Sequence, residues 1–232
     1  MLNLARIQAI TLDLDDTLWP VWPTIHRAEE ALQLWLREHA PATAGVFATP
    51  AQRHAVRTVV VAQNPERAHD LSWLRRESIR HALRQVGEDT ALAEPAFEVF
   101  FAARQQVDLF ADALPALQAL SRRFPVVALS NGNADVHRVG LGAYFRASVS
   151  ARDAGVAKPH RAIFAAGAAA VDVAPEAVLH VGDDAHLDVV GALDAGMQTA
   201  WVNREGKAWE HPGHRPHSEV TDLAALCRLL GL

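Results

Sequence analysis

The sequence contains a single cysteine, Cys227, among 232 residues. One thiol excludes an intrachain disulfide and is typical of a protein kept in a reducing compartment. No apolar stretch approaches the roughly 18 to 20 residues that a membrane-spanning helix needs. Residues 1–6 lack the charged region, apolar core and small-residue cleavage site of a signal peptide. These absences predict a cytoplasmic protein without a membrane anchor.

An excess of positive charge is also missing. The chain has 22 basic and 27 acidic residues, a formal net charge of −5, and no basic cluster. Nucleic acid and anionic membranes are therefore not expected as partners, and a small soluble ligand is favoured. A hydrophobic content of 50% excludes a disordered chain, and the length allows one substantial domain with a subdomain. Monomer and homodimer both remain open.

Short apolar runs rich in β-branched residues alternate with helical patterns over much of the chain. Three segments with apolar residues at three- and four-residue spacing predict crossover helices, at 114–123, 160–170 and 188–195. Alternating strands and helices predict an α/β fold with a doubly wound parallel sheet, which binds ligands beyond the carboxyl ends of its strands. The five predicted strands are 7–12, 124–129, 147–150, 177–181 and 198–202.

Residues 19–110 break this alternation. They contain several amphipathic helical patterns punctuated by prolines, without a convincing strand, and predict a helical cap inserted into a core made of residues 1–18 and 111–232. Near the end of the chain, residues 206–216 are predicted to form a solvated loop. The predicted cap helices are 24–39, 51–62, 69–86 and 96–110.

A pair of aspartates follows the first predicted strand. Asp13 and Asp15 lie where the chain leaves that strand toward Thr17. One carboxylate in such a loop can attack phosphorus, while its neighbour protonates the leaving oxygen and then takes a proton from water. The alternative is an acidic turn in which Asp16 or Thr17 caps the next helix.

Two further blocks suit the binding of a phosphoryl group. Ser130 ends a predicted strand, and the amides of the turn 131–133 together with its hydroxyl can bind phosphoryl oxygens. Lys158 precedes the helical pattern 160–170, where the helix dipole disfavours a cation, so an anionic ligand or carboxylate is expected nearby. A plain turn and a solvated surface lysine are the alternatives.

The last block places carboxylates in the loop after a buried strand. Gly182 allows close backbone approach, and Asp183 is the candidate metal ligand. Mg²⁺ prefers one or two carboxylates together with substrate phosphate and water. Asp188 would hold a metal-bound water or orient Lys158. Asp184 has an ordinary helix N-terminal role as its alternative.

The four blocks together resemble the signature of the haloacid dehalogenase superfamily of phosphohydrolases. That signature is an Asp-x-Asp-x-Thr strand end, a Ser or Thr strand end, a Lys, and a Gly-Asp pair with a trailing Asp. All four occur here in order, and the resemblance covers essentially the whole chain, including a helical cap between the first two blocks. It implies a Rossmann-like core and dependence on Mg²⁺.

The resemblance also implies roles for individual residues. Asp13 would be the nucleophile and Asp15 the acid and base, while Ser130 and Lys158 would hold the phosphoryl group. Mg²⁺ would be bound by the Asp13 carboxylate, the Asp15 backbone carbonyl and Asp183. Asp188 is counted with these metal-site residues for the role given above, holding a metal-bound water or orienting Lys158. True dehalogenases of the superfamily lack the second aspartate, so its presence disfavours dehalogenation.

A closer resemblance is to bacterial phosphatases that hydrolyse flavin mononucleotide and the ribitylaminouracil phosphate of riboflavin biosynthesis. The blocks that carry it are 12–19, 130–133, 140–145 and 180–184. Thr17 and Asn131 are candidate substrate-binding residues in the core. Aromatic rings can stack on a heterocyclic leaving group and arginine can pair with phosphate, so the further candidates are Trp19, Trp22, Trp73 and Arg75. The alternative places the tryptophans in the packing of cap and hinge.

The sequence thus predicts a Mg²⁺-dependent phosphomonoester hydrolase acting on a small phosphorylated metabolite through an aspartyl-phosphate. A phosphotransferase or phosphomutase could use the same intermediate and remains an alternative. A 2-haloacid dehalogenase and a non-catalytic phosphometabolite sensor are less favoured, because Asp15 is present and the set of chemical residues is intact.

Overall fold

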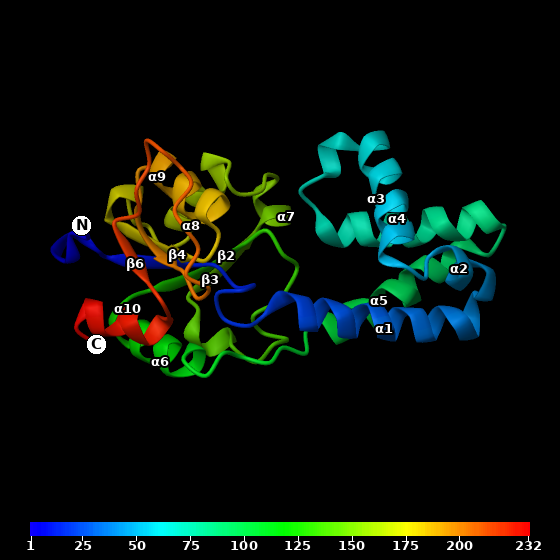
Figure 1. Cartoon of the computed structure of the whole chain (residues 1–232), viewed down its shortest axis with the longest axis horizontal. Coiled ribbons are helices and arrows are strands. Elements are labelled where there is room, and N and C mark those ends of the chain that lie inside the picture. The colour runs from blue at the N-terminus through cyan, green and yellow to red at the C-terminus, as the bar shows by residue number, and fades with distance from the viewer. The chain divides into compact units, whose positions relative to one another are not determined.

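A computed structural model describes residues 1–232 and divides into two compact units (Figure 1). The core unit comprises Met1–Pro20 and Asp108–Leu232, and the cap unit comprises Val21–Val107. These boundaries lie within three residues of the limits expected at 18 and 111. No helix is long and apolar enough to cross a bilayer.

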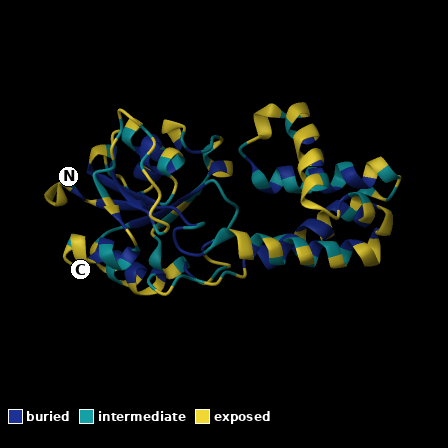
Figure 2. Ribbon diagram, viewed as in Figure 1, coloured by how far each residue is buried: buried dark blue, intermediate teal, exposed yellow.

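The core unit is built on a six-stranded, entirely parallel sheet with the order β3-β2-β1-β4-β5-β6. The fold class expected from the sequence is therefore confirmed. All residues of β1, β2, β4 and β5 are buried, as expected for strands covered on both faces (Figure 2). The strands are β1 (Ala9–Leu12), β2 (Val126–Ser130), β3 (Ala147–Ser150), β4 (Val178–Gly182), β5 (Gln198–Val202) and β6 (Ser218–Val220).

Helices cover both faces of this sheet, with α6 and α10 on one side and α8 and α9 on the other (Figure 1). The core helices are α6 (Ala113–Arg123), α7 (Ala151–Ala154), α8 (Arg161–Ala169), α9 (Gly191–Asp194) and α10 (Leu223–Leu230). A π-helical segment, Ala185–Val190, precedes α9, and short 3-10 turns lie at Leu4–Arg6, Gly142–Tyr144 and Pro175–Ala177. The order of strands and helices brings the carboxyl ends of β1, β2 and β4 together at one edge of the sheet.

The cap unit is entirely helical. Local signals set the ends of its helices: Asp70 Oδ1 accepts the Trp73 N–H at 2.9 Å at the start of α4, and Gly87 ends that helix at a φ of 77° that glycine adopts without strain. Its own apolar core includes Leu32, Phe47 and Phe97. The helices are α1 (Val21–His39), α2 (Pro41–Val46), α3 (Pro50–Gln63), α4 (Leu71–Val86) and α5 (Ala93–Arg104), with 3-10 turns at Pro65–Arg67 and Thr90–Leu92.

Three local expectations are wrong. The predicted helix 96–110 ends at Arg104, and Phe110 instead donates its N–H to the Leu18 carbonyl at 2.9 Å. A sixth strand, β6, was not expected, because its three residues are mostly polar and carry no alternation. The helix expected over 188–195 begins earlier as a π-helical segment, in which the Val189 N–H bonds the carbonyl five residues back.

Candidate active site

Asp13 lies immediately beyond β1 and is buried. Its N–H donates to the Val181 carbonyl at 2.9 Å, which extends the pairing of β1 with β4 by one residue and fixes the backbone of the aspartate. The sequence therefore delivers this carboxylate to the edge where β1, β2 and β4 end, as expected for a doubly wound sheet.

Lys158 is held by the turn that follows β2. The Asn131 side chain accepts the Lys158 N–H at 2.7 Å and donates to the Lys158 carbonyl at 3.0 Å, so one amide fixes both sides of this residue. The Ser130 hydroxyl accepts the Gly132 N–H at 2.9 Å and shapes the same turn. Both Ser130 and Lys158 are buried. Asn131 thus positions Lys158, and its expected contact with substrate stays a prediction.

The Lys158 ammonium bridges two carboxylates. Its Nζ lies 2.5 Å from Asp13 Oδ1 and 2.6 Å from Asp188 Oδ1, and all three side chains are at most 9% exposed. The solvated surface lysine considered as the alternative is not what the structure contains. A charge-assisted pair of this kind fixes the carboxylate of Asp13 in one orientation.

The space beside Gly182 is filled by the Asp188 side chain. A Cβ at this position would lie 2.3 Å from the carboxylate carbon of Asp188 and could not be accommodated without displacing it. Asp188 Oδ2 in turn accepts the Asp184 N–H at 3.0 Å. The Asp184 side chain accepts the N–H groups of His186 and Leu187, so Asp184 has the helix N-terminal role considered as its alternative.

Asp183 completes the acidic group. The Thr17 hydroxyl donates to Asp183 Oδ1 at 3.0 Å, and the Trp201 indole donates to the Asp183 carbonyl at 2.7 Å. Thr17 is fully buried, and its expected contact with substrate stays a prediction. The structure instead gives Thr17 a contact with a carboxylate that is expected to bind metal.

Three carboxylates converge to form a candidate metal site. One carboxylate oxygen from each of Asp13, Asp183 and Asp188 lies within 4.8 Å of the other two. No other group of three or more His, Cys, Asp or Glu side chains has this spacing. Hard oxygen donors of this kind fit Mg²⁺. The Asp15 side chain is not in the group: its Oδ1 accepts the Trp19 indole N–H at 2.8 Å, and the role of its backbone carbonyl stays a prediction.

The electrostatics of the group favour a bound cation. Burial raises the pKa of Asp13 well above its ordinary value, and the nearby charges of Asp188 and Asp183 add to this effect. The Lys158 ammonium acts in the opposite direction and only partly offsets the rise. Burial and the neighbouring Asp188 raise the pKa of Asp183 to about 7. Burial disfavours the ionised form of Asp188 too, but Lys158 and His180 hold its pKa well below the usual range. The single Lys158 ammonium therefore does not neutralise the three carboxylates. A divalent cation bound beside it would supply the missing positive charge.

The aromatic and arginine candidates have different surroundings. Trp19 is fully buried in the core unit, whereas Trp22 is 68% exposed. Trp73 is partly buried against the apolar core of the cap. In the cap, Arg75 donates to Glu29 at 2.7 Å and its guanidinium carbon lies 4.2 Å from the centre of the Phe100 ring. These contacts occupy Arg75 within the cap, and its pairing with substrate stays a prediction.

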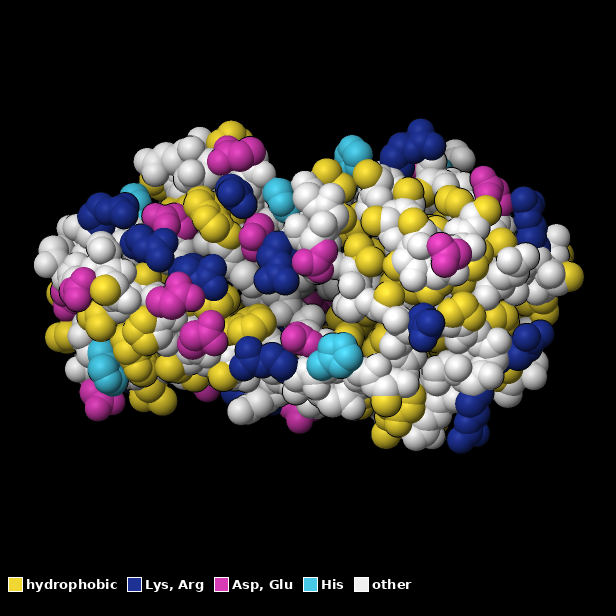
Figure 3. Space-filling model, turned by 180° about the vertical axis from the view of Figure 1, so that it is seen from behind, with side chains coloured by type: hydrophobic (Ala, Val, Ile, Leu, Met, Phe, Trp, Pro, Cys, Tyr) yellow, Lys and Arg dark blue, Asp and Glu magenta, His cyan; other side chains and the backbone are white.

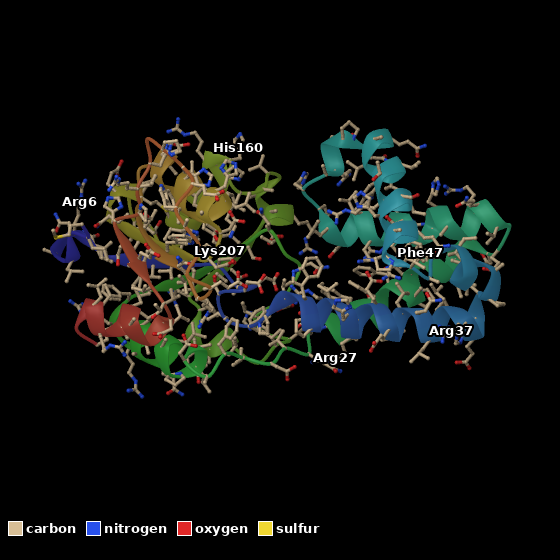
Figure 4. All side chains as sticks on the ribbon, in the orientation of Figure 1. Arg6, Arg27, Arg37, Phe47, His160 and Lys207 are labelled. Carbon is tan, nitrogen blue, oxygen red and sulfur yellow. The ribbon has the colours of Figure 1, made fainter.

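A cavity of about 370 Å³ opens beside Asp183 in the core unit. Residues 206–216, the loop expected to be solvated, contribute Lys207 (labelled in Figure 4) and His211 to the wall of this cavity. The His211 ring is stacked on that of His186, with ring centres 5.6 Å apart. Trp209 orders this loop by donating its indole N–H to the carbonyls of His211 and His214. On the core-unit surface visible in Figure 3, separate basic side chains and fewer acidic ones lie among apolar and uncharged surface, without a basic patch.

Sequence analysis overlooked His180, which contacts Asp188 from the middle of β4. Its Nε2 lies 3.1 Å from Asp188 Oδ1, and its Nδ1 lies 2.9 Å from the Thr11 hydroxyl. The only signal in the sequence is an imidazole inside an otherwise apolar run, which indicates burial but not the partner.

Comparisons with known proteins show the family of the chain. A sequence model of the haloacid dehalogenase-like hydrolases matches residues 7–196. The 5-amino-6-(5-phospho-D-ribitylamino)uracil phosphatase YigB of Escherichia coli (strain K12) is 34% identical over 98% of this chain and 98% of its own. The N-acylneuraminate-9-phosphatase of Mus musculus is 26% identical over 99% of this chain and 96% of its own.

Among solved structures, the crystal structure of a 2-haloacid dehalogenase from Pseudomonas syringae pv. Tomato DC3000 superimposes with a TM-score of 0.91. It shares 38% sequence identity and covers 97% of this chain and 98% of its own. The similarity therefore extends over the residues of both the core and the cap.

Proposed function

This chain belongs to the haloacid dehalogenase-like hydrolases, and from that premise we propose that it is a Mg²⁺-dependent phosphomonoester hydrolase with Asp13 as nucleophile. The observation that carries the proposal is the bridging of Asp13 and Asp188 by Lys158, beside the carboxylate of Asp183. A nucleophile, a cation and a candidate metal site at one sheet edge are the parts that phosphoryl transfer requires.

Two displacements at phosphorus complete the proposed reaction. In the first, an Asp13 oxygen forms a bond to phosphorus, the bond to the ester oxygen breaks, and Asp15 gives its proton to that leaving oxygen. In the second, water attacks phosphorus, Asp15 takes the proton from water, and the bond between Asp13 and phosphorus breaks to release phosphate. The Trp19 indole holds Asp15 Oδ1 throughout, which orients the carboxyl group for both proton transfers.

Lys158 and the turn after β2 would bind the phosphoryl oxygens. The ammonium is kept charged because Asp13 and Asp188 raise its pKa against the effect of burial. Ser130 is placed beside it by the same turn. Mg²⁺ held by Asp13, Asp183 and Asp188 would stabilise the negative charge that develops on the transferring group.

For the substrate, we propose a phosphate ester of a nitrogen heterocycle or its polyol conjugate, such as ribitylaminouracil phosphate or flavin mononucleotide. The full-length similarity to YigB supports this choice. The cavity beside Asp183 also supports it, because the stacked imidazoles of His186 and His211 and the ammonium of Lys207 offer a polar leaving group both stacking and hydrogen bonds.

Dehalogenation of a 2-haloacid is the second candidate, because the solved relative with a TM-score of 0.91 is described as a 2-haloacid dehalogenase. The residue that separates the two is Asp15. Displacement of a halide ion needs no proton for the leaving group, whereas an alkoxide leaving group does.

A panel of phosphate esters tests the proposal. Phosphate release would be measured from flavin mononucleotide, ribitylaminouracil phosphate, nucleotides and sugar phosphates, with Mg²⁺ and with chelator. Asp13→Asn should abolish release, whereas Asp194→Asn, which changes an exposed aspartate of the same unit, should not. Mg²⁺-dependent release of phosphate from at least one ester supports the proposal. Transfer of phosphate to an added alcohol in place of water would identify a phosphotransferase. If no ester in the panel released phosphate, the proposed hydrolase function would be refuted.

A further inference from the structure

His180 has a polar partner at each ring nitrogen although it is only 1% exposed. Thr11 Oγ1 lies 2.9 Å from Nδ1, and Asp188 Oδ1 lies 3.1 Å from Nε2. Thr11 and His180 are register partners in β1 and β4, so the sheet itself sets the first of these contacts. Phe164 packs edge-on against the ring with centres 5.1 Å apart, which limits its rotation.

The partners determine where the hydrogens lie. Asp188 Oδ1 also accepts from the Lys158 ammonium, so the carboxylate is ionised and can only accept from His180. The imidazole must therefore carry its hydrogen on Nε2. At Nδ1 the ring meets the Thr11 hydroxyl, a group that can donate to a neutral imidazole. Nδ1 is then an acceptor, and the Thr11 hydroxyl donates to it at 2.9 Å in preference to the weaker acceptor Met197 Sδ at 3.9 Å.

Asp188 consequently receives three donors from three different segments of the chain. His180 of β4 and Lys158 both donate to Oδ1, while the Asp184 N–H donates to Oδ2. Without the imidazole, Oδ1 would retain the lysine alone and Oδ2 the Asp184 N–H, so the carboxylate would be held less firmly. Lys158 would then lose the fixed partner that keeps it between Asp188 and Asp13.

We propose that His180 is a positioning residue of the active site, which as the Nε2–H tautomer fixes Asp188 and, through it, the Lys158 ammonium on Asp13. A buried histidine that donates to a carboxylate beside a metal site is a known means of orienting that carboxylate. Packing alone does not account for the residue. The other four residues of β4 are apolar or glycine, and an apolar side chain would fill the space without the cost of burying an imidazole.

The tautomer is tested directly on the wild-type protein by NMR. Long-range proton–nitrogen correlation at neutral pH, with His180 assigned by the loss of its signals in His180→Gln, distinguishes the two neutral tautomers and the imidazolium. We expect the Nε2–H form. An Nδ1–H tautomer or an imidazolium would overturn the proposal, because neither combines a donor toward Asp188 with an acceptor toward Thr11. This measurement needs neither substrate nor metal.

Two amide substitutions test the positioning. Glutamine reaches the place of Nε2 and can donate to Asp188, whereas asparagine reaches only the place of Nδ1. We expect His180→Asn to lower kcat by about 10-fold to 100-fold with little change in KM, and His180→Gln to lose less than about 10-fold. Mg²⁺ affinity, measured by calorimetry without substrate, should follow the same order. His54→Asn, an exposed histidine of the cap, is the matched control.

Equal losses in the two variants, or a change in KM alone, would show a merely structural role and overturn the proposal. Urea midpoints of both variants would be measured, so that a loss of folding is not taken for a loss of positioning. The kinetic comparison rests on the proposed phosphatase activity. If the wild-type protein hydrolysed no ester, that function would fail, while the tautomer and the Mg²⁺ affinities would still decide the role of His180.

Discussion

The Nζ of Lys158 lies 2.5 Å from Oδ1 of Asp13, and neither side chain is more than 9% exposed. The two residues are 145 positions apart in the sequence, and the lysine reaches the aspartate because the turn after β2 holds its backbone on both sides. Removing one partner of such a buried pair leaves the remaining charges uncompensated.

Lys158→Met should therefore destabilise the metal-free protein. We expect a loss of about 3 kcal/mol in the free energy of unfolding by urea, because Asp13 and Asp188 would lose their shared cation. Mg²⁺ should recover part of the loss. Lys207→Met is the matched control: its ion pair with Glu205 is exposed and should contribute less than about 1 kcal/mol. Equal effects of the two substitutions would contradict this account.

Asp15→Asn should impair hydrolysis in proportion to how much the leaving group needs a proton. For an alkyl phosphate we expect kcat to fall by about 100-fold to 10,000-fold. For p-nitrophenyl phosphate, whose phenolate leaves without a proton, the fall should be much smaller. The measurement is the ratio of the two kcat values in wild-type and variant protein. An unchanged ratio would rule out Asp15 as the general acid.

Binding of Mg²⁺ should release protons near neutral pH. The pKa of Asp183 is raised to about 7 by burial and by Asp188, so the metal-free protein retains a proton that Mg²⁺ must displace. The affinity should accordingly rise as pH increases from about 6 to 8. Calorimetry in two buffers of different ionisation enthalpy measures the protons released. Asp183→Asn should reduce this release, and an identical heat in both buffers would disprove the assignment.

The ion pair between Asp112 and Arg204 should stabilise the core unit above acidic pH. Burial opposes ionisation of Asp112, but hydrogen bonds from Arg204 and the Leu223 N–H lower its pKa. Because the folded pKa lies below the unfolded value, the stabilisation is present above about pH 4 and is lost as pH falls through the folded pKa.

Asp112→Asn should thus lower the free energy of unfolding by about 2 kcal/mol at pH 7. Urea unfolding at pH 7 and at pH 3 measures the effect, and the difference from wild type should shrink at the lower pH. Glu205→Gln, at an exposed pair, should have little effect at either pH. A difference that grew on acidification would have the wrong sign.

Much of the fold followed from local pattern, because buried parallel strands are continuous apolar runs and crossover helices have a clear period. The strand β6 escaped detection because its Ser218-Glu219-Val220 segment pairs with β5 only in the folded sheet. The end of α5 at Arg104 could not be predicted either, because the helical pattern of apolar residues continues beyond it. In the structure Phe110 instead bonds the Leu18 carbonyl.

Some residues of the candidate site could likewise be predicted from the sequence, and others could not. Asp13, Lys158 and Asp183 follow predicted strand ends or begin a predicted helix, so their convergence could be foreseen from topology. The contact of His180 with Asp188 could not, because a histidine inside a strand does not reveal which side chain its ring meets. Arg75 was singled out for its charge, but its bond to Glu29 depends on how α1 and α4 pack.

The most direct test of the central claim compares phosphate and chloride release by one protein preparation. Wild type and Asp13→Asn would be incubated with p-nitrophenyl phosphate and with (S)-2-chloropropionate, each with and without Mg²⁺. We predict Mg²⁺-dependent release of phosphate by wild type, a loss on the order of 1,000-fold or more in Asp13→Asn, and no release of chloride. Chloride release by wild type without phosphate release, or full phosphate release by Asp13→Asn, would contradict the account.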